Sequence, residues 1–129
     1  MTALSLKTLK VADWELDFYS RPIIESNGKK RWELLISSTE DFSGDKPFRW
    51  SKKCPAGEVN SKWLTEALQE ALDQSNSEGW QFPSKLRFWR PSMRTMIKKA
   101  ADNVGIDPIA SRRTYSLIEW LKERREDIY

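Results

Sequence analysis

Histidine is absent from the 129-residue chain, and cysteine occurs only once, at Cys54. Without histidine, this chain builds neither a Ser-His-Asp triad nor a metal site with imidazole ligands. One cysteine forms neither an intrachain disulfide nor a cysteine zinc site, which fits a reducing compartment. The five glycines are isolated, so a glycine-rich phosphate loop is absent too. We therefore expect a protein that is not an enzyme and that holds no cofactor and no metal.

Long apolar runs are also absent. No stretch approaches the ~20 apolar residues of a membrane-spanning helix, and the first residues lack the apolar segment of a secretory signal. Hydrophobic residues nevertheless make up 39% of the chain and aromatic residues 12%, which is enough for a buried core. This length is typical of one domain, so we expect residues 1–129 to form a single domain in the cytoplasm.

Alternating apolar and polar residues predict three strands in the first half of the chain. Trp14–Ile23 and Arg31–Ser37 flank the pair Asn27-Gly28, which favours a tight hairpin turn. Phe48–Lys53 is expected to form a third, shorter strand. The face that we expect in the core carries Trp14, Leu16, Phe18, Trp32, Leu34 and Ile36.

Helices and short strands alternate in the second half. Helical spacing of apolar residues covers Ser61–Gln74, and Lys85–Trp89 follows as a strand. A second helix occupies Pro91–Gly105, a short strand Ile109–Ser111, and a last helix begins after Thr114. The order is β-β-β-α-β-α-(β)-α, an α/β (α+β) fold with a mixed sheet. A ribonuclease H-like arrangement matches this order, and a generic α+β sandwich is the alternative.

Positive charge is concentrated in Lys85–Arg113, which holds eight basic residues against two aspartates. The net charge of this segment is +6, and because the whole chain carries +3, the remainder carries −3. A basic segment on a weakly acidic body indicates a polyanionic partner. Arginine binds phosphate and stacks on bases, and an exposed aromatic ring adds a stacking surface, so the pattern favours single-stranded RNA. The alternative is a solvated basic helix face with Trp89 in the core.

The candidate RNA-binding residues follow from this pattern. Arg90, Arg94 and Lys98 are spaced to form one basic stripe along the second helix. An Arg90→Ala/Arg94→Ala variant is expected to lose RNA affinity without unfolding. Arg21 stands at a strand end next to Pro22 and is a further candidate. The full set is Arg21, Arg87, Trp89, Arg90, Arg94, Lys98, Arg112 and Arg113.

A metal-dependent nuclease is the third hypothesis, after RNA binding and a protein-interaction module, because the ribonuclease H-like arrangement suggests such an enzyme. The reaction needs several carboxylates around two Mg²⁺ ions about 4 Å apart. Asp17 on the first strand and Glu66 or Glu70 on the first helix could supply two of them. The fourth strand offers only Lys85 and Arg87 nearby, and their positive charge would repel the metal.

The main alternative to RNA binding is a protein-interaction module, in which the basic stripe meets an acidic protein surface. The carboxylates Glu15, Asp17 and Glu33 also have an ordinary structural interpretation. They form the polar face of the first hairpin, and we expect them to pair with lysines and arginines.

Three segments resemble one protein family. They are WELDFYSRPIIESNGKKRWELLI (14–36), FWRPSM (88–93) and SRRTYSLIEWLKER (111–124), and the family is the Tab-two-like one of cyanobacteria and of plant and algal chloroplasts. The resemblance implies an RNA-binding protein, of which this chain is the N-terminal half without the C-terminal half. Plant and algal members activate translation of photosystem I messages or act in photosystem biogenesis. No catalytic residue is implied.

The residues and the resemblance together define the leading hypothesis. We expect an RNA-binding domain that supports translation or biogenesis of photosystem I and that binds single-stranded, A/U-rich RNA. Translation or photosystem assembly proteins are the expected protein partners. The start at Met1 without an Arg/Ser-rich leader favours a cyanobacterial cytoplasm, whereas plant and algal relatives act in the chloroplast stroma.

Overall fold

The computed structural model describes residues 13–24, 28, 30–39 and 46–128, with the side chains of residues 20–24, 30 and 125–128 left out. Every predicted strand and helix of these segments is present, in the predicted order. The elements are β1 (Trp14–Ile24), β2 (Lys30–Ser38), β3 (Arg49–Cys54), α2 (Ser61–Ser77), β4 (Lys85–Phe88), α3 (Arg94–Val104), β5 (Asp107–Ala110) and α4 (Tyr115–Ile128).

The five strands form one mixed sheet in the order β3-β2-β1-β4-β5. β1, β2 and β3 are antiparallel neighbours, whereas β4 runs parallel to β1, and β5 runs parallel to β4. The two parallel connections contain α2 and α3, as crossovers between parallel strands require. The predicted mixed α/β class is confirmed.

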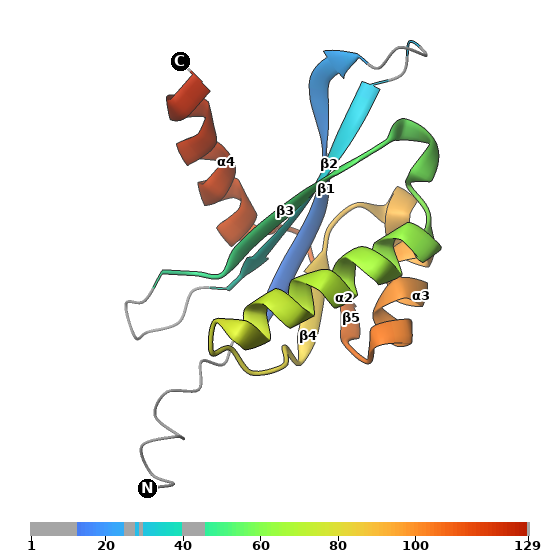
Figure 1. Ribbon diagram of the computed structural model, residues 1–129, viewed down its shortest axis with the longest axis vertical. Coiled ribbons are helices and arrows are strands. Elements are labelled where there is room, and N and C mark those ends of the chain that lie inside the picture. Colours follow the sequence, from blue (N-terminus) through green and yellow to red (C-terminus); the bar gives the residue numbers. More distant parts are fainter. Residues whose placement is uncertain (1–12, 25–27, 29, 40–45, 129) are drawn as a thin grey trace, which may run out of the picture.

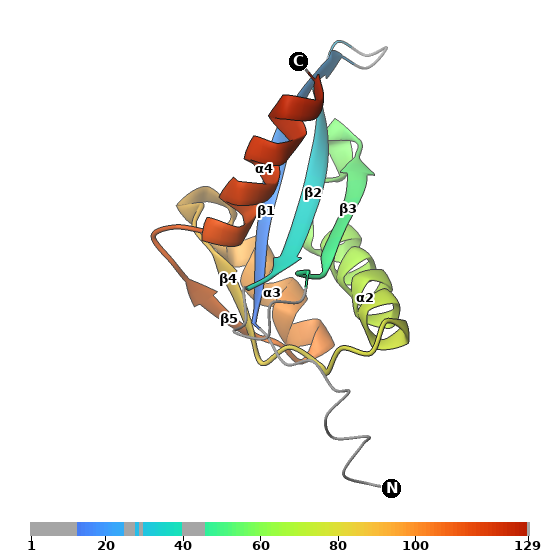
Figure 2. The same cartoon turned by 90° about the vertical axis from the view of Figure 1, so that its left-hand side faces the viewer.

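The helices lie on both faces of the sheet. α2 and α3 cover one face, and α4 covers the other, where it crosses β1 and β2 (Figures 1 and 2). The hydrophobic core lies under α2 and α3, and it includes the predicted strand residues Trp14, Leu16 and Phe18. The side chain of Asn60 accepts a hydrogen bond from the backbone N–H of Trp63 at 2.8 Å and so caps α2.

The predicted polar face of the first hairpin lies under α4. Glu15 and Glu33 are only 4% and 5% exposed, because α4 lies over them. Leu117 of α4 is buried against this face. Arg124 of α4 donates to Glu33 at 2.7 Å, which confirms the expected pairing of this carboxylate with a basic residue. The polar side of the hairpin thus positions the last helix.

Candidate nucleic-acid interface

A cavity of about 380 Å³ opens where α4 begins, beside β1 and the end of β4. We call it the Trp89 cavity. Four residues of the predicted set line it, namely Trp89, Arg90, Arg112 and Arg113. The other lining residues are Asp17, Tyr19, Thr114, Leu117, Ile118 and Leu121. The structure therefore brings the end of the fourth strand and the Arg112-Arg113 pair together, although α3 and β5 separate them in sequence.

Asp17 holds Trp89 and Arg90 in place at this cavity. Its Oδ1 accepts a hydrogen bond from Arg90 Nε at 2.6 Å, and its Oδ2 accepts from Trp89 Nε1 at 3.2 Å and Arg90 Nη2 at 3.3 Å. The Arg90 guanidinium carbon lies 4.5 Å from the Trp89 ring centroid, which is a cation–π distance. The Trp89 side chain is 42% exposed, so it lies in neither the core nor free solvent. Asp17 and Arg90 thus fix the orientation of the Trp89 ring, and the rest of the ring stays accessible to a ligand.

Arg112 and Arg113 differ from Arg87 and Arg90, the two arginines of the predicted set that form ion pairs in the described part of the chain. Both are exposed, and neither forms an ion pair with a side chain that the structure describes. Arg87, by contrast, donates to Asp13 at 3.2 Å, and Arg90 is bound to Asp17. A paired arginine presents little net charge to a ligand, because its carboxylate partner offsets it. The positive charge available at the cavity therefore comes from Arg112 and Arg113.

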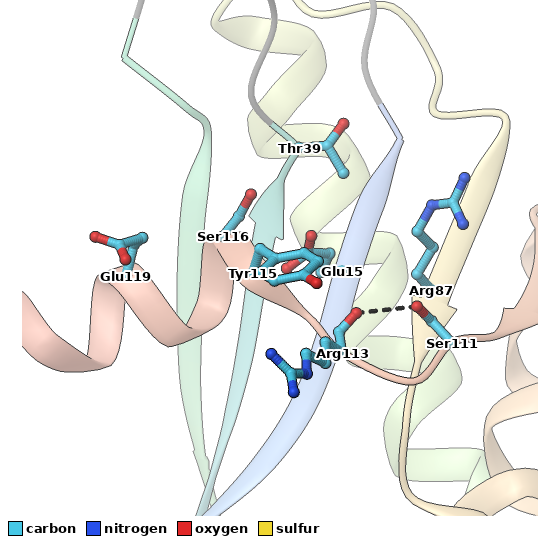
Figure 3. Close-up of a pocket in the computed structure, with 8 residues that line it drawn as sticks. All are labelled: Glu15, Thr39, Arg87, Ser111, Arg113, Tyr115, Ser116 and Glu119. Atoms are coloured by element: carbon cyan, nitrogen blue, oxygen red, sulfur yellow. Dashed lines mark hydrogen bonds between the residues drawn. The ribbon is translucent and has the colours of Figure 1, made fainter.

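A second cavity, of about 550 Å³, lies on the other side of Arg113. Figure 3 shows Arg113 in the segment that leads into α4, the side chains of Tyr115 and Glu15 close together in this view, and Arg87 on β4. Because Arg87 lines it, we call it the Arg87 cavity. Its remaining lining residues are Thr39, Ser111, Ser116 and Glu119. Arg113 lines both cavities, so one guanidinium can reach ligand groups in either of them.

Glu15 closes the floor of the Arg87 cavity and caps α4. Its Oε1 accepts a hydrogen bond from the backbone N–H of Leu117 at 3.1 Å, in the first turn of the helix. A carboxylate there satisfies a helix N–H that has no partner within the helix. Burial raises the pKa of Glu15 above its ordinary value, and hydrogen bonds from Leu117 and Ser116 and the charge of Arg87 only partly offset this.

This raised pKa predicts a pH dependence of stability. Because the folded state holds the proton of Glu15 more tightly than the unfolded state, the stabilising contribution is complete below the unfolded pKa and is lost as pH rises through the folded pKa. Urea unfolding at about pH 4 and about pH 7 measures it. We expect the wild type to lose more unfolding free energy over this interval than Glu15→Gln, which does not titrate. Equal losses in both proteins would contradict the assignment.

The predicted basic stripe does not form one continuous surface. Arg90 has an extended backbone, and Pro91 opens a short 3-10 turn before α3 begins at Arg94. Arg90 consequently lies beside Asp17 on the α4 side, whereas Arg94 and Lys98 belong to α3, which covers the opposite face of the sheet (Figure 1). Arg21 belongs to β1, but its side chain lies outside the described part of the molecule.

The sequence analysis missed the apolar wall of the Trp89 cavity. Leu117, Ile118 and Leu121 of α4 form this wall. Only Leu117 is fully buried, while Ile118 remains 39% exposed at the cavity. The signal was present in the sequence, because an apolar helix side directly follows the Arg112-Arg113 pair.

The carboxylates of the nuclease hypothesis do not come together. Asp17 faces α4 and binds Arg90, whereas α2, which carries Glu66 and Glu70, covers the opposite face. Glu70 forms an ion pair with Lys52 of β3. Among the described residues, no group of three or more histidine, cysteine, aspartate or glutamate side chains could hold a metal ion. Within the same residues, no helix is long and apolar enough to cross a membrane.

The fold and the two cavities define a mixed α/β domain with a basic and aromatic site at the start of its last helix. The family model described as "RNA-binding protein Tab2/Atab2 N terminal" matches residues 13–124, and the chain belongs to this family, as its motifs indicated. Two relatives, each named "Protein TAB2 homolog, chloroplastic", come from Zea mays and Arabidopsis thaliana. Each is 36% identical over 119 residues, which is 92% of this chain but 28% and 30% of the respective relative. The chain thus spans less than a third of these relatives.

A solved structure shares the fold. A chain in the cryoEM structure of the simian T-cell lymphotropic virus intasome in complex with PP2A regulatory subunit B56 gamma aligns with a TM-score of 0.50 and 14% identity. The alignment covers 81% of this chain and 33% of the other. At this identity, the likeness concerns the arrangement of the strands and helices alone.

Proposed function

We propose that this domain binds single-stranded, A/U-rich RNA at the start of α4. The observation that carries the proposal is the pair of exposed arginines without a carboxylate partner among the described side chains, Arg112 and Arg113, beside the accessible ring of Trp89. Guanidinium groups neutralise phosphates, and an aromatic ring stacks on an unpaired base. The family description names RNA-binding proteins, which supports the same ligand class.

The remaining candidates extend this site in two directions. Arg87 lines the neighbouring cavity and contributes if its pairing with Asp13 loosens in the complex. Arg94 and Lys98 contact RNA only if the strand passes around the end of β4 to α3. Arg21 is kept as a further contact. Arg90 has a different role in the proposal, because its guanidinium binds Asp17 and positions the Trp89 ring.

The cellular role follows from the resemblance. We place the domain in a factor that supports translation or biogenesis of photosystem I, acting without catalysis in the cyanobacterial cytoplasm together with translation or assembly proteins. The two relatives that are 36% identical to this chain over 119 residues are named as chloroplastic proteins.

Fluorescence anisotropy with a labelled A/U-rich RNA, titrated at several salt concentrations, tests RNA binding directly. Each phosphate contact with a single strand lowers the slope of log affinity against log salt by roughly 0.7. Contacts from Arg112 and Arg113 therefore predict a slope steeper than about −1.4. Absence of binding at low salt would overturn the proposal for this domain.

A protein-interaction module is the second candidate, and exposed apolar side chains favour it. Ile118 and Tyr115 are exposed next to Arg112 and Arg113, which is the composition of many protein interfaces. The occupant would be an acidic protein surface with an apolar centre. Salt dependence discriminates the two functions, because an apolar interface gives a shallow slope, whereas RNA binding gives a steep one.

A further inference from the structure

We infer that the Trp89 cavity receives a single unstacked nucleobase, while the phosphates on either side of that base lie against Arg112 and Arg113. This inference rests on the proposed RNA binding and goes beyond it, because it assigns the base and the backbone to separate parts of the surface. It makes the domain a reader of unpaired nucleotides rather than a general polyanion binder.

The size and the walls of the cavity fit a flat, largely apolar group. Its volume of about 380 Å³ lies within the range of small-molecule pockets, roughly 300–1,000 Å³. Leu117, Ile118 and Leu121 form an apolar wall from α4, and Trp89 lines the cavity from the end of β4. Bound bases commonly stack on aromatic rings in this kind of setting.

Charge is distributed to match a nucleotide. The arginines without a partner among the described side chains, Arg112 and Arg113, lie in the short segment that leads into α4, and Arg113 also lines the neighbouring cavity. A base that enters between Trp89 and α4 therefore leaves its sugar-phosphate backbone beside two guanidinium groups. An uncharged apolar ligand would gain nothing from these two charges, whereas a nucleotide uses both parts of the site.

The polar groups of the cavity do not select one base. Both oxygens of Asp17 already accept hydrogen bonds from Arg90 and Trp89, so this carboxylate has little remaining capacity to read a base edge. Tyr19 and Thr114 carry hydroxyl groups that can donate or accept. The cavity therefore selects for an unstacked base, whatever the identity of that base. A preference for A/U-rich RNA then arises because weakly paired RNA presents such bases at lower cost.

Two oligomers of equal charge separate base insertion from phosphate binding. One is hexauridylate, and the other is a six-residue ribose phosphate of the same length without bases. We expect the wild type to bind hexauridylate about tenfold more tightly, and Trp89→Ala to reduce this ratio towards one while leaving the salt slope unchanged. Phe82→Ala is the matched control, because Phe82 is an exposed aromatic residue outside the cavity. Hexacytidylate is expected to bind within about threefold of hexauridylate.

A cavity-filling variant keeps the test independent of the stability of Trp89→Ala. Ile118→Trp adds volume at an exposed position of the cavity wall and is expected to lower the ratio in the same way. Equal affinity of the wild type for both oligomers, with a steep salt slope, would overturn base insertion and leave RNA binding intact. A tenfold ratio that survives both variants would place the base elsewhere and also overturn it. Binding of neither oligomer would contradict the proposed function itself.

Discussion

Replacing Arg112 and Arg113 together by alanine is expected to weaken binding of A/U-rich RNA about 50-fold at roughly 50 mM salt and to make the negative salt slope shallower by about 1.4. Both side chains are exposed and lack a described ion-pair partner, so their charge is free to neutralise phosphates. For the same reason, their removal breaks no described contact of the fold, and the free energy of unfolding should change by less than about 0.5 kcal/mol. Anisotropy titrations and urea unfolding of the same preparations measure the two effects.

The control is a pair of lysines with the same total charge elsewhere on the domain. Lys62 and Lys99 line a shallow pocket between α2 and α3, on the face opposite α4. At an ionic strength of 0.1 M, charges more than about 10 Å apart are largely screened, so Lys62→Ala/Lys99→Ala should change RNA affinity only slightly. Equal losses for the two double variants would mean that net charge, rather than the site at α4, determines binding.

The strands and helices could be predicted because their patterns are local. Trp14, Leu16 and Phe18 alternate with polar residues, and a period of two leaves only one way to bury them in a sheet. The burial of the other face of the first hairpin, under α4, could not be predicted in this way. Glu15 and Glu33 look like solvent-facing residues in the sequence, and only the packing of α4, which supplies the Leu117 N–H and Arg124, explains their burial.

The sequence predicted which segment carries the candidate site, but it did not predict how the side chains of that segment are arranged in space. Sequence spacing placed Arg90 in line with Arg94 and Lys98, as though one helix carried all three. The structure begins α3 only at Arg94, and the partner of Arg90 is Asp17, 73 residues earlier in the chain. Which arginine is paired and which is free depends on such long-range contacts, and no local pattern encodes them.

Arg90→Ala is expected to lower the free energy of unfolding by about 2–3 kcal/mol. Asp17 is only 13% exposed, and without Arg90 its carboxylate keeps a single described hydrogen bond, from Trp89. A largely buried carboxylate that loses its cationic partner keeps the free-energy cost of desolvation without the compensating ion pair. Chemical unfolding monitored by circular dichroism measures the loss. The sequence alone predicted that removing Arg90 and Arg94 weakens RNA binding without unfolding the domain, and this result would add a loss of stability to that expectation.

A double-mutant cycle with Asp17→Ala separates the pairing from the packing of the two side chains. If the ion pair is the main contribution of Arg90, the double variant is destabilised by about 1–3 kcal/mol less than the sum of the single variants. Arg94→Ala serves as the control, because Arg94 is exposed on α3 and should show no coupling to Asp17. Additive effects at Asp17 and Arg90 would contradict the structural role, and Arg90 would then join Arg112 and Arg113 as a cation free to bind phosphate.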